Sequence, residues 1–233
     1  MKTKPFKQLL MAVTLLLACP SHGSTIFWGS DFNSILLTSD GQPLDGSFSF
    51  ELGAFTSGFE PTIHNTNQWQ ANWKVFDRAF DPTPEDINDG DPEGWNEIDR
   101  FFVGTVDHNS AGGSSSPDAN PADVFAQDDV AYLWVYNSKS IVPGSEWALV
   151  KDITNLPNTW RFPDPNDSGS YNWDLADADA AIIGGVNGVQ GDGAFSFDPG
   201  TFNLQTHVVP EPGSALLLMF ALMAWTSSRR LRP

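Results

Sequence analysis

The sequence predicts an all-β fold: a single β-sandwich or barrel-like domain with one short helix, flanked by an N-terminal signal peptide and a C-terminal transmembrane sorting tail. Short apolar stretches alternate with turns rich in Gly, Pro, Asn and Asp, and one stretch alone has a helical period. Such a pattern is typical of sandwiches and barrels. We therefore divide the chain into a signal peptide at 1–23, a β-rich exported domain at 24–209 and a tail at 210–233.

The N-terminus has the three parts of an export signal. Lys2, Lys4 and Lys7 form a basic region, residues 9–18 are apolar, and small residues precede Ser24. We predict cleavage after Gly23, with lipidation of Cys19 as the alternative. Cys19 is the one cysteine of the chain. Its removal with the peptide would exclude disulfides and thiolate chemistry from the mature protein.

Several stretches of the body have the residue pattern of strands. Residues 129–136 are apolar on both faces, which predicts a central strand, and residues 146–152 return after Pro143-Gly144 to complete a hairpin. Residues 47–54 alternate apolar and polar side chains, which predicts a half-buried strand. Further strands are expected at 100–107, 160–162, 180–186 and 193–197. Residues 24–37 are a weakly patterned lead-in, and residues 164–179 are expected to form an acidic loop.

The helical period falls between residues 65 and 80. Trp69, Trp73, Phe76 and Phe80 are spaced by four, three and four residues, which places them on one face of a helix. The pattern therefore predicts the helix of the domain here.

Tryptophans admit two interpretations. They can form the hydrophobic core, or exposed rings can stack on the faces of sugar rings. The residues considered for sugar stacking are Trp69, Trp95, Trp147, Trp160 and Trp173.

An acidic loop follows the predicted helix at 81–99. Oxygen-bearing residues at short spacing with a glycine for a sharp turn are a feature of calcium loops. The candidate ligands are Asp86, Asn88, Asp89 and Asp91. The loop departs from the EF-hand pattern, since Gly90 stands at the fifth position, where that pattern has an oxygen ligand. A solvated acidic loop is the alternative, and no cofactor other than calcium is expected.

Charge narrows the range of partners. Between Ser24 and Pro212 the chain has six Lys and Arg against twenty-nine Asp and Glu, a net charge of −23. Nucleic acid is excluded as a partner because its phosphates require a basic face. The sequence contains no G-x-S-x-G, H-E-x-x-H, P-loop or G-x-G-x-x-G motif, and no catalytic residue is predicted.

The tail has three parts in a fixed order. Pro210, Glu211 and Pro212 come first, and the two prolines hold the backbone extended. An apolar helix is predicted at about 213–228, short against the ~20 residues that span a bilayer. A basic end at 229–232 follows, with Arg229, Arg230 and Arg232 expected to stay on the cytoplasmic side.

This order, over residues 208–233, resembles the PEP-CTERM sorting domain of exosortase substrates. The resemblance implies processing by an exosortase, a membrane protease, usually in Gram-negative bacteria that make exopolysaccharide. An ordinary membrane anchor is the alternative. We expect export through the inner membrane, transient anchoring there, and release to the cell surface or extracellular matrix, where exopolysaccharide is a further expected partner.

Three functions remain open for the body. The first is a surface or exopolysaccharide-matrix protein with no enzymatic activity of its own. The second is a carbohydrate-binding module, with calcium as an aid to binding. The third is a secreted glycoside hydrolase, which would need two carboxyl groups facing each other across a cleft.

Overall fold

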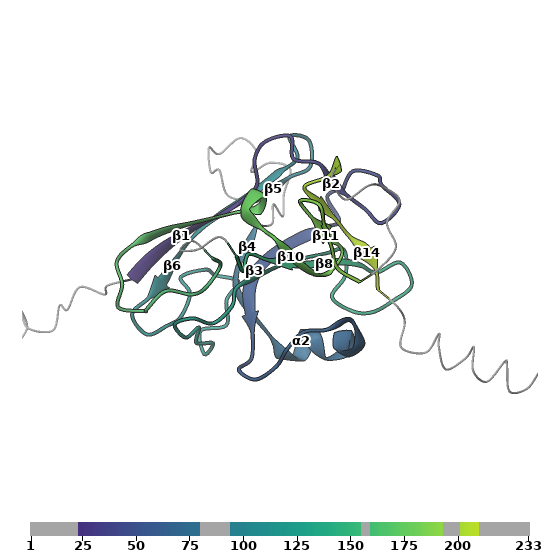
Figure 1. Cartoon of the computed structure of the whole chain (residues 1–233). Helices are drawn as coiled ribbons and strands as arrows, with labels where there is room; N and C mark the ends of the chain where they lie inside the picture. Colours follow the sequence, from purple (N-terminus) through teal and green to yellow (C-terminus); the bar gives the residue numbers. More distant parts are fainter. Residues whose placement is uncertain (1–22, 80–93, 155–158, 193–200, 210–233) are drawn as a thin grey trace, which may run out of the picture.

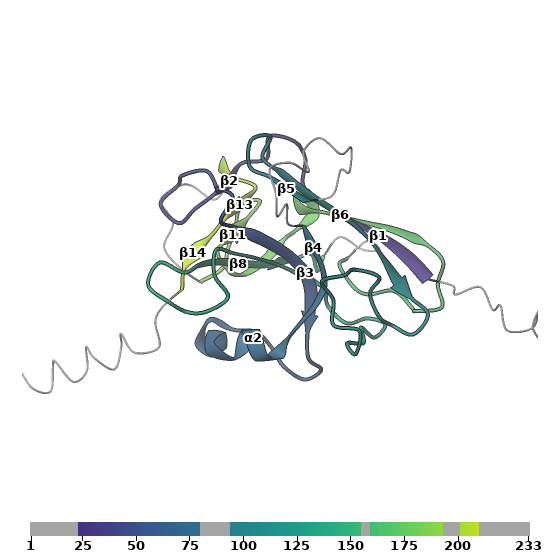
Figure 2. The same cartoon turned by 180° about the vertical axis from the view of Figure 1, so that it is seen from behind.

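The computed structural model describes residues 23–79, 94–154, 159–192 and 201–209, and these form an all-β domain with one short α-helix (Figures 1 and 2). The first sheet has the strand order β5-β6-β1-β9, and the central sheet has the order β10-β8-β7-β3-β4, with β14 also pairing with β8. A small third sheet has the order β12-β11-β13-β2. The predicted all-β class is confirmed.

The first sheet packs on one face of the central sheet, which makes a sandwich. Its strands are β1 (Gly23–Gly29), β5 (Gly94–Asn96), β6 (Phe101–Asn109) and β9 (Ser170–Asp174). Ile26, Trp28 and Phe102 from this sheet meet Phe50 and Leu133 of the central sheet in one buried cluster. Burial of these large apolar side chains, each worth roughly 1.5–3 kcal/mol, joins the two layers.

The central sheet is buried on both faces in its middle. Its strands are β3 (Ser49–Phe55), β4 (Trp73–Ala79), β7 (Tyr132–Tyr136), β8 (Glu146–Lys151), β10 (Ala180–Ile183) and β14 (His207–Val208). Strand β7 lies between β8 and β3 with every residue buried, which confirms both the central strand and the hairpin predicted from the sequence. The strand predicted at 47–54 is confirmed as β3, but its half-buried character is wrong, because Glu51 and Phe55 are buried as well as Phe50 and Leu52.

The second face of the central sheet carries an aromatic layer. The layer includes Phe55, Trp69, Trp134 and Trp147, and the short helical segment made by η1 (Ile63–Gln68) and α2 (Trp69–Asn72) belongs to it through Trp69. This helical segment covers the aromatic layer, which would otherwise face solvent. The strands beneath it are therefore buried on both sides, and strands of this kind do not alternate apolar and polar residues.

The helix predicted at 65–80 ends at Asn72, and Trp73 to Ala79 form strand β4 instead. The register between β3 and β4 shifts between Leu52 and Gly53, which pair with Asp77 and Val75 respectively. The shift leaves Phe76 as the extra residue of a β-bulge. A short helix followed by a bulged strand therefore produced the spacing of four and three residues that indicates a helix.

Two strands, β1 and β9, lie in stretches whose residue pattern is weak. In the lead-in, β1 has Ser24, Ile26 and Trp28 buried on one side, and in the second acidic stretch β9 pairs with β1 in parallel. The loop predicted at 164–179 therefore contains a strand and the short 3-10 helix η3 (Leu175–Asp177). Because β9 pairs with β1 alone, it is an edge strand of the first sheet.

The small sheet closes one end of the sandwich. Its strands are β2 (Leu36–Leu37), β11 (Gly185–Val186), β12 (Val189–Gln190) and β13 (Leu204–Gln205). The stretch predicted at 180–186 divides into β10 and β11, and the strand predicted at 193–197 lies outside the described residues. Residues 160–162 contribute one isolated bridge, between Arg161 and Val130.

Candidate functional site

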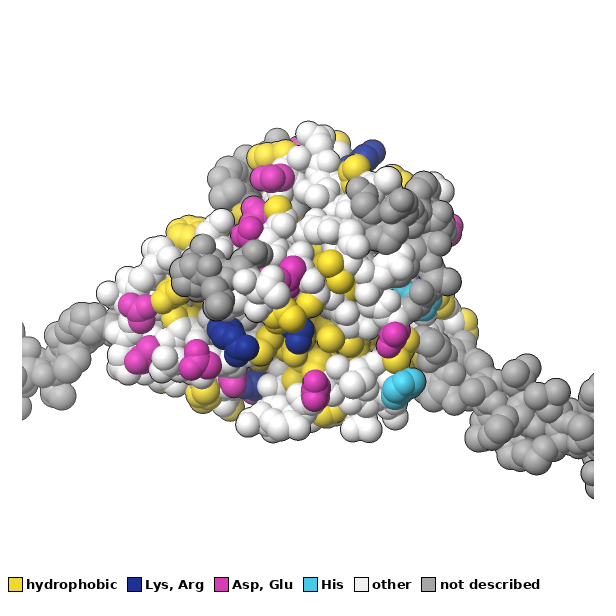
Figure 3. Space-filling model, in the orientation of Figure 1, with side chains coloured by type: hydrophobic (Ala, Val, Ile, Leu, Met, Phe, Trp, Pro, Cys, Tyr) yellow, Lys and Arg dark blue, Asp and Glu magenta, His cyan; other side chains and the backbone are white. Residues whose placement is uncertain are grey.

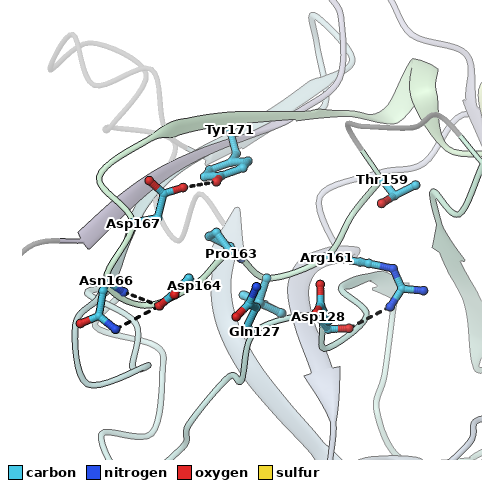
Figure 4. A pocket seen from close by; sticks show the side chains of 10 residues that line it. Gln127, Asp128, Thr159, Arg161, Pro163, Asp164, Asn166, Asp167 and Tyr171 are labelled. Atoms are coloured by element: carbon cyan, nitrogen blue, oxygen red, sulfur yellow. Dashed lines mark hydrogen bonds between the residues drawn. The ribbon is translucent and has the colours of Figure 1, made fainter.

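A cleft of about 680 Å³ opens on the side of the domain where β9 forms the edge of its sheet (Figure 4). Eight of the ten residues that line it are polar or charged, and the other two are Phe162 and Pro163. The lining residues are Gln127, Asp128, Thr159, Arg161, Phe162, Pro163, Asp164, Asn166, Asp167 and Tyr171. The volume is in the range of ligand pockets, ~300–1,000 Å³.

One wall of the cleft is the turn that leads into β9. The Tyr171 hydroxyl donates to Asp167 Oδ2, and Asp167 Oδ1 accepts from the backbone N–H of Ser168 at 2.7 Å. The neighbouring Asp164 Oδ1 accepts from both the backbone N–H and the side-chain Nδ2 of Asn166, at 2.9 and 3.0 Å. These bonds fix the direction of the turn's side chains, which lie together on one side of the hollow in Figure 4.

The other wall consists of two segments that pair through their backbones. Asp128 N–H donates to Phe162 O at 2.9 Å, and Phe162 N–H donates to Asp129 O at 3.0 Å. Arg161 Nη1 donates to Asp128 O at 2.8 Å, which holds the guanidinium in the wall. The buried ring of Phe162 contacts Phe76, Phe125 and Trp173, so the base of this wall is anchored in the core.

The charge of the cleft is predominantly negative. Asp128, Asp164 and Asp167 face one cation among the lining residues, Arg161. The hydrogen bond from Tyr171 holds the pKa of Asp167 below its usual value, and the same bond raises the pKa of Tyr171 to about 12. At neutral pH the pair is therefore a carboxylate with a neutral phenol. On the face in Figure 3 acidic side chains are scattered widely, in keeping with the net charge of the chain.

A second group of charged residues lies on the central sheet around Glu51, whose side chain is fully buried. Its Oε1 accepts from Arg78 Nη2 at 2.5 Å and from the Tyr136 hydroxyl at 2.7 Å. Its Oε2 accepts from Trp73 Nε1 at 2.8 Å and pairs with Lys139 Nζ at 2.5 Å. Burial by itself raises the pKa of Glu51, but the Lys139 and Arg78 charges and the hydrogen bonds outweigh it and lower the pKa.

The Glu51 cluster is suited to holding the structure together. Both carboxylate oxygens accept bonds from protein side chains, which leaves little capacity to take a proton from a substrate. The bonds connect β3 to β4, to β7 and to the loop that carries Lys139. We therefore regard the cleft, and not this cluster, as the candidate site.

The five tryptophans considered for sugar stacking are buried, with 0–5 % of each residue exposed. Trp69 stacks on Trp147 with ring centroids 5.4 Å apart, and Trp95 and Trp173 contact Phe50 and Phe162 in the inter-sheet core. A flat row of exposed rings is therefore not formed by these residues, and the core interpretation holds for them. Trp69 and Trp147 are buried in the aromatic layer on the second face of the central sheet, and Trp95, Trp160 and Trp173 are buried between the two large sheets.

Other predicted site residues lie outside the described part of the chain. These are the calcium candidates Asp86, Asn88, Asp89 and Asp91, the sorting motif Pro210 to Pro212, and the arginines Arg229, Arg230 and Arg232. Within the described ranges no group of three or more His, Cys, Asp or Glu is placed to hold a metal ion. The helices in those same ranges are all too short or too polar to cross a membrane.

Sequence reasoning missed the cleft. The sequence predicts a short strand at Arg161 and a loop at Tyr171, and no local pattern connects the two residues. One signal was present: Tyr171 and Trp173 alternate with polar residues, which is the period of a strand.

Comparison with known proteins adds no relative. The chain matches no protein-family model, no curated protein and no solved structure. The described residues define a β-sandwich-like domain with a polar, acidic cleft at its open side.

Proposed function

We propose that this protein is an exported cell-surface or exopolysaccharide-matrix protein that an exosortase sorts, and that its body has no enzymatic activity of its own. One observation carries the proposal: Pro210-Glu211-Pro212, an apolar stretch and an arginine cluster follow one another at the C-terminus. The basic region and apolar stretch of the N-terminus support export through the inner membrane.

The parts of the tail have different tasks in this proposal. The exosortase reads an extended backbone just outside the membrane, which Pro210 and Pro212 impose on either side of Glu211. The apolar helix presents that backbone, and the arginines stop the chain on the cytoplasmic side. The motif should therefore tolerate no change, whereas the helix should tolerate exchange among apolar residues.

Substitution in the tail tests this division. In a bacterium that has the exosortase, Pro210→Ala and Glu211→Ala should block removal of the tail, and Leu217→Met, the matched control, should not. The triple substitution of Arg229, Arg230 and Arg232 should release unprocessed protein to the periplasm, detected by fractionation and blotting. Equal processing of both motif variants and wild type would show that the motif is only a spacer.

The cleft favours a second candidate function for the body, a carbohydrate-binding module. Its walls present hydroxyl, amide, carboxylate and guanidinium groups, which together can donate to and accept from sugar hydroxyls. Both candidates are compatible, since a matrix protein needs a means of staying in the matrix.

A further inference from the structure

The cleft combines three features of a ligand site in one place. It is large enough for a short oligosaccharide, Arg161, Asp164 and Asp167 are held by the protein's own hydrogen bonds, and an aromatic ring lies at its upper wall in Figure 4. Tyr171 is half-buried, and its ring packs against the inter-sheet core while its hydroxyl is bound by Asp167. The ring is therefore held in one orientation before any ligand arrives.

The two walls are fixed to different sheets, which makes the cleft preformed. On one side, Thr25 N–H of β1 donates to Gly169 O at 3.0 Å and Ser24 Oγ donates to Asp167 O at 3.1 Å. On the other side, Ala131 N–H donates to Trp160 O at 2.9 Å, next to Arg161. A preformed site costs little ordering entropy when a ligand binds.

The chemistry of the lining selects among ligands. Tyrosine supplies an apolar ring face together with a polar group, and such a ring can cover the apolar face of a pyranose. Gln127 and Asn166 each carry both donor and acceptor atoms, and sugar hydroxyls can engage both kinds. Arg161 adds N–H donors, and Asp164 adds acceptor oxygens.

The charge of the cleft excludes acidic saccharides as ligands. Three carboxylates and one guanidinium line the cleft, and the body around it has a large negative charge. An acidic glycan would bring further carboxylates against these, and like charges in one site repel. The net negative charge would attract a cationic sugar, so a cationic probe is needed to separate ionic attraction from recognition of sugar hydroxyls.

We propose that this cleft binds a neutral saccharide chain, with Tyr171 stacking on one pyranose ring and Arg161, Gln127 and Asn166 holding its hydroxyls. The inference rests on the second candidate function and names its site and ligand class. It does not depend on sorting, because binding is measured on purified protein whatever the state of the tail.

The test is direct binding by isothermal titration calorimetry on the exported full chain. The probes are a panel of neutral hexasaccharides of glucose, galactose and mannose in α and β linkages, with hyaluronan, alginate and chitosan hexamers as charged probes. We expect binding of at least one neutral probe and of neither acidic one. Tyr171→Ala should weaken that binding by about tenfold or more, through loss of the ring contact.

Matched variants distinguish saccharide binding in the cleft from binding elsewhere on the protein surface. Tyr171→Phe keeps the ring and should bind within about threefold of wild type, since one exposed hydroxyl is lost. Phe27, exposed on the outer face of the same sheet, is the control ring, and Phe27→Ala should bind as wild type does. Gln127→Ala changes an exposed side chain on the opposite wall, so it should fold normally and still weaken binding.

Several results would overturn the proposal. The first is no heat of binding with any neutral probe. The second is binding of the acidic or chitosan hexamers alone, and the third is neutral binding that Tyr171→Ala and Gln127→Ala both leave unchanged. If Tyr171→Ala loses binding and thermal melting shows that this variant is unfolded, the binding of Gln127→Ala decides whether the cleft is the site.

Discussion

Replacing Glu51 by Gln removes the one buried anion that pairs with both Arg78 and Lys139. Removal of one partner from a buried ion pair typically costs about 3–5 kcal/mol, because the remaining charge has lost its counter-charge. Here the side chains of Arg78 and Lys139 are 30 % and 21 % exposed, and Arg78 Nη1 also lies 3.4 Å from Asp118 Oδ1. Solvent and Asp118 offset part of the loss, so we expect the lower end of that range, about 3 kcal/mol.

The assay is urea unfolding of wild type and Glu51→Gln, followed by circular dichroism. Because the pKa of Glu51 is lowered in the folded state, its contribution is present above the unfolded value of 4.5 and is lost as pH falls through the folded value. The difference between the two proteins should therefore be largest near neutral pH and shrink in acid. Exposed Glu97 supplies the control, Glu97→Gln, with an expected change within about 0.5 kcal/mol.

Two outcomes would refute this reasoning about Glu51. A loss below about 1 kcal/mol at neutral pH would place the cluster among ordinary surface ion pairs. A difference that persists unchanged in acid would show that the loss comes from packing and not from the carboxylate charge.

Three further predictions concern the inter-sheet core and the aromatic layer. Burial raises the pKa of Asp77 despite the 2.7 Å bond from Trp28 Nε1, so the contribution of Asp77 to stability should fall as pH rises from the unfolded value of 3.8 through the folded value. Asp77→Asn should therefore unfold at an equal or higher urea concentration than wild type at neutral pH, and lose that advantage in acid. Trp69→Ala should cost about 3–5 kcal/mol in urea unfolding, against less than about 1 kcal/mol for Phe27→Ala, because Trp69 is fully buried and Phe27 is 44 % exposed. In Gly104→Ala a new Cβ would lie 2.3 Å from Trp28 Nε1 and 2.6 Å from Asp77 Oδ2, so the melting temperature should fall with a loss of about 1–3 kcal/mol; an unchanged melting temperature would show that the two sheets can separate freely there.

The fold was predictable where a run of neighbouring residues indicates burial by itself. In β7 the aromatic and aliphatic residues occupy both faces, and that pattern alone indicates a central strand. Glu51 shows the limit of this reasoning. A glutamate between Phe50 and Leu52 indicates a solvent face, yet Arg78 and Lys139, distant in sequence, neutralise it in the interior.

The predicted helix is too long, and the cleft was not predicted, for two different physical reasons. The bulge at Phe76 breaks the two-residue period of β4, and together with Trp69 on the preceding helix it imitates a helical face. The cleft as a whole has no local signature, because Gln127, Arg161 and Tyr171 are far apart in sequence and meet only in the folded chain. Tryptophan positions were known from the sequence, but whether each ring faces solvent depends on which layers cover the sheet.

Intact-mass spectrometry of the mature protein tests the central claim most directly. The protein should be isolated from a host that has an exosortase and from the same host with the exosortase gene deleted. We predict that the tail from Leu216 to Pro233 is absent in the first and present in the second. The same full tail in both preparations would contradict sorting by an exosortase.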